Sequence, residues 1–318
     1  MKMSRRSRRS SRGKKVFLTI FAIVAALVVI AAGVGAKLYF DLSGSIKQTY
    51  ESVERKNTET KKRQQPVDLN KKEPFSVLLL GIDTGDLGRT EQGRSDTLMV
   101  ATVNPEDNKT TLVSIPRDTY VDIVGYGTQD KINHAYAFGG AAMSMDTVEK
   151  YLDIPIDHYV SINMMGIQEL VDAIGGVDVN NDLEFTQDGH QYAFGPIHLN
   201  GDEALGYIRM RHEDPRGDYG RQLRQRSIVE AVIQKVLTLE GVTQYRNILD
   251  AVEGNMKTDL SFNNMQKIAL DYRSAFTTID QLQMQGDGFM QDGVSYQRVS
   301  NEELQSVQNK LKKQLNTK

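Results

Sequence analysis

The chain has 318 residues, of which 39% are hydrophobic and 25% are charged, a composition typical of a globular protein with a substantial core. The net charge of −2 conceals an asymmetry, because residues 1–15 carry eight Lys or Arg and no acid, which leaves 31 basic against 41 acidic residues in the remainder. An acidic body excludes a general nucleic-acid-binding surface, and the absence of cysteine excludes disulfides, thiolate zinc sites and cysteine nucleophiles.

An uncharged segment follows this basic tail, which is expected to stay in the cytoplasm. Residues 16–36 contain no charged side chain and are long enough to cross a bilayer as a helix, so we predict an N-terminal transmembrane signal-anchor. Positive charges before such a span predict a single-pass type II protein of the cell membrane with an extracellular body. A cleaved signal peptide is the alternative, since residues 34–36 have the small side chains of a cleavage site. Residues 37–74, rich in Lys, Gln, Glu and Asn, are expected to form an extracellular stalk before a folded domain at 75–318.

Three strands are predicted where this domain begins. The sequence FSVLLLGID from Phe75 predicts a buried strand, and strand-like runs follow at 97–103 and 110–115. Polar side chains at strand ends are a common way to build a site on a rigid sheet. The polar residues at these strand ends are Asp83, Arg94, Asp96, Arg117 and Asp118.

Asp83 and Asp96 are the candidate metal ligands. Magnesium needs only one or two carboxylates when substrate phosphates complete its coordination shell. The alternative is that each aspartate bonds the backbone of its own turn. Lys131, which follows a Gly-rich turn, is either a further phosphate contact or a surface lysine. The five histidines show no metal-binding spacing and are predicted to be hydrogen-bonding or surface residues.

Helical and strand patterns alternate through the next part of the chain. A helix is predicted at 142–152, a strand at 158–162, a helix at 165–174 and a strand at 177–179. This alternation predicts an α/β fold, an α/β/α-type sandwich with helices packed on a central mixed sheet. Between apolar helices and such a sheet, an open slot for a long lipid tail and a filled core are both consistent with the sequence.

Six arginines lie within residues 207–226. Two of them, Arg209 and Arg211, point to one face if the segment is extended. A loop follows, and then a helix predicted to begin at an N-cap, Asp218, and to continue to about residue 239. On that helix Arg221 and Gln225 lie one turn apart near the positive end of the helix dipole, with Arg224 beside them as a further substrate contact. Arginine forks match phosphate oxygens, so the segment predicts a site for a multiply charged phosphate, the alternative being a solvated basic helix face.

Six motifs, taken together in this order, resemble those of the LytR-CpsA-Psr family. The resemblance is strong over residues 75–240 and weaker beyond them, and the predicted anchor and stalk fit the family's architecture. The motifs are LLLGID, GRSDTLM, SIPRDTY, KINHAYAFGG, AIGGVDV and IRMRHEDPRGDYGRQLRQR.

The resemblance implies a transferase of cell wall assembly. Such an enzyme moves an anionic glycopolymer, for example wall teichoic acid, from a polyprenyl pyrophosphate carrier to a hydroxyl of peptidoglycan on muramic acid. It implies that Asp83 and Asp96 hold Mg²⁺ on the pyrophosphate and that Asp96 or Asp118 deprotonates the acceptor. The residues implied to bind the phosphates are Arg94, Arg117, Arg209, Arg211 and Arg221, supported by Lys131, Asp218 and Gln225.

Two other functions use the same residues. A pyrophosphatase of the lipid carrier would have the same site with water as the nucleophile, and a non-enzymatic protein would bind the lipid or the wall. Comparing a lipid pyrophosphate with and without a peptidoglycan acceptor separates the transferase from the pyrophosphatase.

Overall fold

A six-stranded mixed sheet forms the centre of the computed structural model, which describes residues 49–55, 61–83, 92–238, 248, 251 and 253–317. Strand β1 runs parallel to β6 and antiparallel to β2, and β12 is parallel to β3. The strands lie in the order β11 (Met256–Thr258), β6 (His158–Asn163), β1 (Phe75–Ile82), β2 (Ser95–Asn104), β3 (Lys109–Ser114) and β12 (Thr278–Gln283). This order confirms the expected α/β fold with a central mixed sheet.

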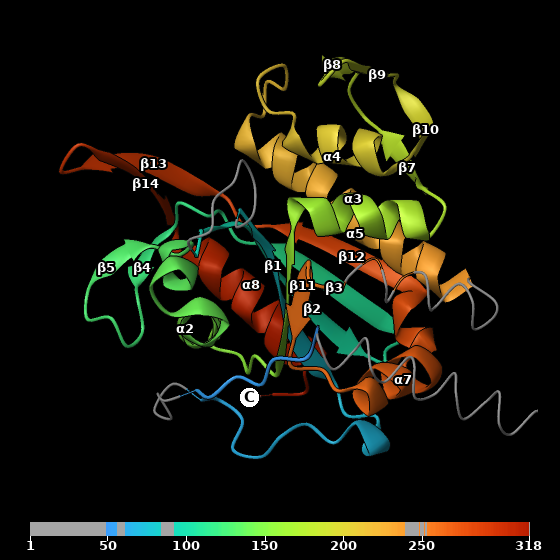
Figure 1. Ribbon diagram of the computed structural model, residues 1–318. Coiled ribbons are helices and arrows are strands. Elements are labelled where there is room, and N and C mark those ends of the chain that lie inside the picture. The colour runs from blue at the N-terminus through green and yellow to red at the C-terminus, as the bar shows by residue number, and fades with distance from the viewer. Residues whose placement is uncertain are drawn as a thin grey trace, which may run out of the picture. The chain divides into compact units, whose positions relative to one another are not determined.

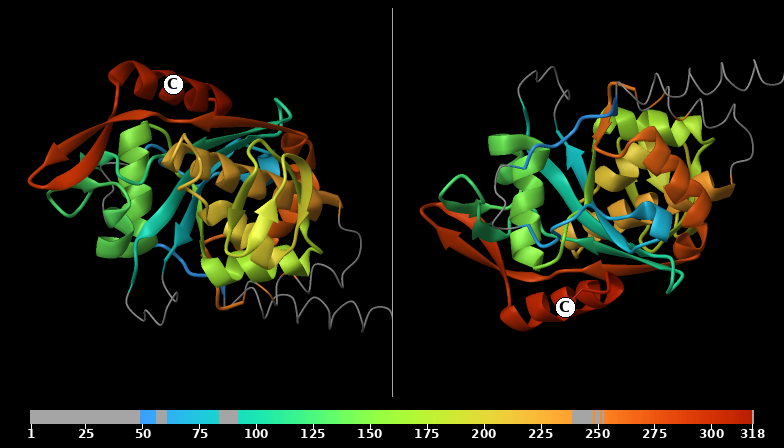
Figure 2. Two further views of the ribbon diagram at one scale, coloured as in Figure 1. Left: turned by 90° about the horizontal axis from the view of Figure 1, so that it is seen from above. Right: turned by 90° about the horizontal axis from the view of Figure 1, so that it is seen from below.

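Helices cover both faces of the sheet, because its central strands have apolar side chains on both faces. Leu78 and Leu80 of β1 pack toward α2 (His134–Leu152) and α8 (Asn301–Gln314). Leu79, on the other face, points toward α3 and α5. Figures 1 and 2 show α2 on one side of the strands and α3 and α5 on the other. The helices of this second side are α3 (Met164–Ala173), α4 (Gly201–Arg209), α5 (Asp218–Thr238) and α7 (Phe262–Asp271).

Smaller elements surround this centre. Two short 3₁₀ helices, η1 (Leu69–Lys71) and η3 (Arg273–Phe276), accompany α7. Four two-stranded sheets lie outside the central one. They pair β4 (Tyr120–Asp122) with β5 (Gln129–Lys131), β7 (Val177–Asn181) with β10 (Gly195–Leu199), β8 (Phe185–Gln187) with β9 (His190–Tyr192), and β13 (Gly286–Gln291) with β14 (Val294–Val299).

The described part of the expected stalk packs against the body. Glu51 N donates to Thr258 O at 2.8 Å, and Arg55 Nη1 lies 2.8 Å from Glu149 Oε2, which is buried. Residues 49–55 and 61–74 are therefore part of the folded unit and not a separate stalk. Residues 16–36, where the signal-anchor is predicted, lie outside the described residues. Within the described part of the chain no helix is both long enough and apolar enough to cross a membrane.

The segment around Arg209 differs from its expected conformation. Arg209 is the last residue of α4, so it and Arg211 do not share one face of an extended strand. This helix begins with a capping box, in which the Asn200 side chain accepts from Glu203 N while the Glu203 side chain accepts from Asn200 N. A helix starts at this point as predicted, but Asp218 is its first residue and not its N-cap.

Candidate functional site

A β-bulge marks the end of β1 and the start of β2. Gly81 pairs with Thr97, but Ile82 pairs with Ser95, so Asp96 is the extra residue of the bulge. A bulge changes the direction of a side chain at a sheet edge and is frequent beside active sites. Beyond it, Asp83 Oδ1 accepts from the backbone N–H of Arg94 at 2.7 Å, which holds together the chain ends that leave the two strands.

Arg117 follows β3 and contacts the bulge. Its Nη1 donates to Asp96 Oδ1 at 2.5 Å, and its Nε lies 3.9 Å from Asp118 Oδ2. Lys131 Nζ, from β5, lies 2.7 Å from Asp118 Oδ1. Burial opposes the charge of Arg117, but the carboxylates of Asp96, Asp118 and Asp218 outweigh it and raise the pKa of this guanidinium.

The first turn of α5 completes the same cluster. Arg221 Nη2 lies 2.6 Å from Asp218 Oδ1, one turn earlier on the helix. Burial lowers the pKa of Arg221, and the positive charges of Arg117 and Arg211 lower it further against the opposing effect of Asp218 and Asp96. Several cations are thus concentrated at a helix N-terminus, which itself favours anions.

Two buried guanidinium nitrogens of this cluster lack hydrogen-bond acceptors. Within the described residues, Nε of Arg117 and Nε of Arg221 donate to no oxygen. A buried donor without a partner costs about 1–3 kcal/mol, a cost that a ligand supplying oxygens removes. The cluster of Asp96, Arg117, Asp118, Lys131, Arg211, Asp218 and Arg221 is called the cationic cluster below.

Arg209 points to a different part of the molecule. Its Nη1 lies 3.9 Å from Asp188 Oδ2, beyond the end of β8, and its side chain is exposed. Arg94 is also exposed, and Asp83 accepts from its backbone N–H.

Arg224 has a structural environment, which corrects its expected role as a substrate contact. Its side chain is 1% exposed, with Nη1 at 2.7 Å from Asp214 Oδ2 and Nη2 donating to Met210 O at 2.6 Å. The guanidinium also lies over the Phe185 ring. Sequence reasoning missed this role because Arg224 and Arg221 look alike in a pattern of charges, although Arg224 contacts Asp214 and Met210 while Arg221 contacts Asp218.

Asp214 is a second residue that sequence reasoning missed. It accepts from Arg216 Nε and Nη2 and from Arg224 Nη1, and so holds the loop between α4 and α5. A Cβ at Gly220 would lie 1.9 Å from Asp214 Oδ2, so this close approach requires glycine. The Asp-Pro-Arg-Gly-Asp sequence is the signal, since an acid between arginines in a loop is suited to organise them.

An apolar cavity of about 260 Å³ lies between the sheet and helices α3 and α5. Its few polar or small lining residues are Gly81, Thr97 and Gln225. Thr97 follows Asp96 in the chain, and Gln225 lies one helical turn after Arg221, so this end of the cavity adjoins the cationic cluster. The structure thus contains an apolar space, where the sequence left open a slot or a filled core. Its remaining lining residues are Leu79, Leu80, Met99, Val160, Ile162, Met164, Ile167, Leu170, Val171, Ile208, Ile228, Val229, Val232, Ile233 and Met256.

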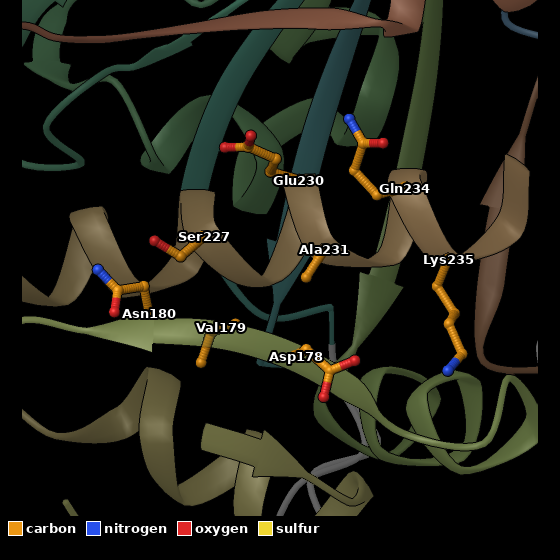
Figure 3. Close-up of a pocket in the computed structure, with 8 residues that line it drawn as sticks. All are labelled: Asp178, Val179, Asn180, Ser227, Glu230, Ala231, Gln234 and Lys235. Atoms are coloured by element: carbon orange, nitrogen blue, oxygen red, sulfur yellow. The ribbon is translucent and has the colours of Figure 1, made fainter. Parts of the chain in front are cut away.

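A second concavity, of about 560 Å³, lies between β7 and α5 (Figure 3). It has none of the predicted residues. Its polar groups serve the fold, because Glu230 accepts from Gln281 and Ser227 Oγ donates to Leu223 O. Its charged lining residues, Asp178 on β7 and Glu230 and Lys235 on α5, are of mixed sign (Figure 3).

The fold and the site together define an α/β domain suited to an amphiphile, with an anionic head on the arginines and an apolar tail in the adjoining cavity. The LytR_cpsA_psr family model matches residues 39–313, and the chain belongs to this family.

Known relatives agree with this assignment. The chain is 65% identical, over 97% of its length and 100% of the relative, to the polyisoprenyl-teichoic acid--peptidoglycan teichoic acid transferase TagU of Enterococcus faecalis. The crystal structure of B. subtilis TagU is 44% identical and covers 78% of this chain and 99% of its own, with a TM-score of 0.64. A structure of TagT bound to LIIa-WTA is 31% identical and covers 80% of this chain and 96% of its own, with a TM-score of 0.68. The resemblance of the motifs to this family is confirmed.

Proposed function

We propose that this chain is a teichoic acid transferase, which moves an anionic glycopolymer from a polyprenyl pyrophosphate to a hydroxyl of peptidoglycan. The observation that carries the proposal is the junction of the cationic cluster with the apolar cavity, since a polyprenyl pyrophosphate needs both environments at once. The relative that is 65% identical over its full length has the same activity in its name.

In this proposal the diphosphate binds to the buried guanidinium groups. Arg117 and Arg221 supply the Nε donors that lack partners, and Lys131 and Arg211 add positive charge. Fixed donors stabilise the charge that develops on the leaving phosphate without having to reorganise. The prenyl chain extends past Gln225 into the cavity between the sheet and α5.

In the transfer step, one bond to phosphorus forms and another breaks. The acceptor oxygen forms a bond to the phosphorus that bears the polymer, and the bond from that phosphorus to the bridging oxygen breaks. Polyprenyl phosphate leaves with the electron pair. The acceptor proton passes to a carboxylate, either Asp96, which Arg117 orients, or Asp118, which Lys131 orients.

Asp83 and Asp96 fit a magnesium ion as hard oxygen donors at neighbouring strand ends. The described residues contain no group of three or more acidic or histidine side chains that would hold a metal without help, so substrate oxygens complete the shell. When bound, the ion neutralises charge on the diphosphate. Asp83 would hold it beside the Arg94 backbone, and Asp96 beside Arg117.

The membrane topology belongs to the same proposal. Residues 16–36 anchor the chain, residues 1–15 stay in the cytoplasm, and the body acts at the outer surface, where peptidoglycan is found. A reporter fused to the C-terminus should be accessible from outside intact cells, and a cytoplasmic reporter would contradict this topology.

The test uses the full chain in detergent with a lipid-linked teichoic acid precursor and magnesium. We expect polymer to become attached to added peptidoglycan, and release to depend on that acceptor. Equal release of polymer phosphate in the absence of peptidoglycan would instead establish the pyrophosphatase.

A further inference from the structure

Two exposed aromatic rings stack on each other beside the cationic cluster. Tyr126, in the turn between β4 and β5, and Phe138, on α2, have ring centroids 4.0 Å apart and an interplanar angle of 9°. Tyr126 is 51% exposed and Phe138 is 38% exposed. An exposed pair of this kind leaves apolar ring surface in contact with water, which is characteristic of a binding surface.

The backbone after Phe138 is held in a conformation that only glycine adopts readily. Helix α2 is interrupted there, with Gly139 at φ −149° and Gly140 at φ 62° and ψ −152°. Such a backbone at Gly140 would be costly for any residue with a Cβ, and conformations of this kind are concentrated at functional sites. The interruption follows directly on the first turn of α2, which packs Ala135 and Tyr136 into the core and presents Phe138 to Tyr126.

A continuous set of contacts joins this ring pair to the cationic cluster. The His134 ring meets Phe138 edge to face at 5.8 Å, and His134 Nδ1 lies 2.7 Å from Asp130 Oδ2. Asp130 Oδ1 accepts from the N–H of Lys131, whose Nζ contacts Asp118. The ring pair is thus linked through His134, Asp130 and Lys131 to Asp118, one of the two candidate bases for the acceptor hydroxyl.

We propose that Tyr126 and Phe138 form a subsite for the acceptor glycan strand, an inference that rests on the proposed transferase function. A pyranose ring has a flat C–H face that stacks on an aromatic ring, and its hydroxyls match the carboxylate and imidazole beside the pair. The nearby charges are mixed, since Asp122 pairs with Lys150 and Asp130 faces His134. Without an excess of cations the surface suits a glycan better than an anionic lipid headgroup.

A tryptophan reporter tests binding without turnover. The chain has no tryptophan, so Tyr126→Trp creates a single fluorophore at the proposed subsite. We expect its emission to change saturably with soluble peptidoglycan glycan strands and not with anionic lipid vesicles. Phe194→Trp is the matched control, because Phe194 is 74% exposed on the far β9–β10 loop. An unchanged Tyr126→Trp signal with glycan, or a response to vesicles alone, would overturn the subsite.

Kinetics separate this subsite from the proposed function. In the transfer assay, Tyr126→Ala and Phe138→Ala should each raise the KM for peptidoglycan about tenfold while kcat and the KM for the lipid donor stay unchanged. Phe194→Ala should leave all three values at the wild-type level. Unchanged acceptor KM in both variants contradicts the subsite and leaves the transferase intact. A wild-type chain that transfers no polymer contradicts the transferase, while the fluorescence titration still reports on glycan binding.

Discussion

Arg117 Nη1 lies 2.5 Å from Asp96 Oδ1, and this contact joins the end of β3 to the bulge of β2. The carboxylate fixes one nitrogen of the guanidinium, while the buried Nε has no acceptor among the described residues. A guanidinium oriented in this way needs no reorganisation when a phosphate binds, which is the condition for strong electrostatic catalysis.

Replacing the Arg117 guanidinium tests its role in phosphate binding. Arg117→Lys keeps the charge but loses the planar arrangement of donors, so we expect the transfer rate to fall about 10²- to 10³-fold. The melting temperature should change little, because the side chain is part of a site and not of the core. Arg273→Lys, at an exposed arginine that donates to Leu237 O, is the control and should transfer normally. A wild-type rate for Arg117→Lys would remove this residue from the site.

Asp214 is predicted to be important for stability. In Asp214→Asn the buried Arg224 loses the carboxylate that pairs with it, which should cost about 3–5 kcal/mol in free energy of unfolding. Asp182→Asn is the matched control, since the Asp182 pair with Arg216 is solvent-exposed and should contribute about 0–1 kcal/mol. Urea unfolding measures both values, and equal effects in the two variants would show that burial of the Arg224 pair has no energetic consequence.

The same aspartate predicts a pH dependence. Burial would raise the pKa of Asp214, but hydrogen bonds from Arg216 and Arg224 outweigh it and lower that pKa below its usual value. Such a carboxylate stabilises the fold above its unfolded pKa of about 3.9, and the contribution is lost as pH falls through the lower folded pKa. The difference in unfolding free energy between wild type and Asp214→Asn should therefore be constant near neutral pH and shrink below about pH 4. If this difference in unfolding free energy grew on acidification, the predicted lowering of the Asp214 pKa would be contradicted.

Much of the fold follows from local patterns. The buried strands β1, β2, β3 and β6 are short apolar runs, and the helix from Asp218 has regular apolar spacing, so both kinds of element were predictable. Helix α4 was not, because Gly201 and Gly206 weaken its helical pattern and a capping box and packing on α3 stabilise it instead. The helical conformation of this segment therefore depends on tertiary contacts, which a local sequence pattern does not contain.

The site was predictable in its residue types but not in its pairings. Strand ends and a helix N-terminus indicated where Arg117 and Arg221 would lie. Asp214 binds the Arg224 guanidinium and so gives it a different environment from that of Arg221, and Asp214 can approach α5 this closely because Gly220 has no Cβ. Neither the ion pair nor the close approach can be seen in a local sequence pattern. The ring of Tyr296, 5.7 Å from Lys131 Nζ, lies far away in sequence and gave no signal.

The apolar cavity yields a prediction about the lipid tail. Val229→Phe places extra carbon in the space beside α5, so it should weaken binding of a long-chain polyprenyl phosphate without weakening binding of inorganic pyrophosphate. Leu270→Phe, at an exposed position on α7, is the control and should bind both ligands as wild type does. Calorimetric titration measures each affinity. Unchanged affinity for the long-chain lipid in Val229→Phe would show that the tail lies elsewhere.

Magnesium dependence tests the two strand-end carboxylates. Chelation with EDTA should abolish transfer by the wild type, and added magnesium should restore it. Asp83→Asn should require a higher magnesium concentration for half-maximal rate, because an amide oxygen is a weaker ligand than a carboxylate. Asp68→Asn, at a half-buried aspartate that caps η1, should keep the wild-type requirement. Full activity in EDTA would contradict the assignment of Asp83 and Asp96 to a metal.

The central claim is that the cationic cluster holds the diphosphate of a polyprenyl carrier. Its most direct test is the binding of polyprenyl pyrophosphate to the full chain and to the Arg117→Ala/Arg221→Ala double variant, with circular dichroism as the check on folding. We predict saturable binding to the wild type that inorganic pyrophosphate displaces, and its loss in a folded double variant. Equal binding to both proteins would contradict the claim.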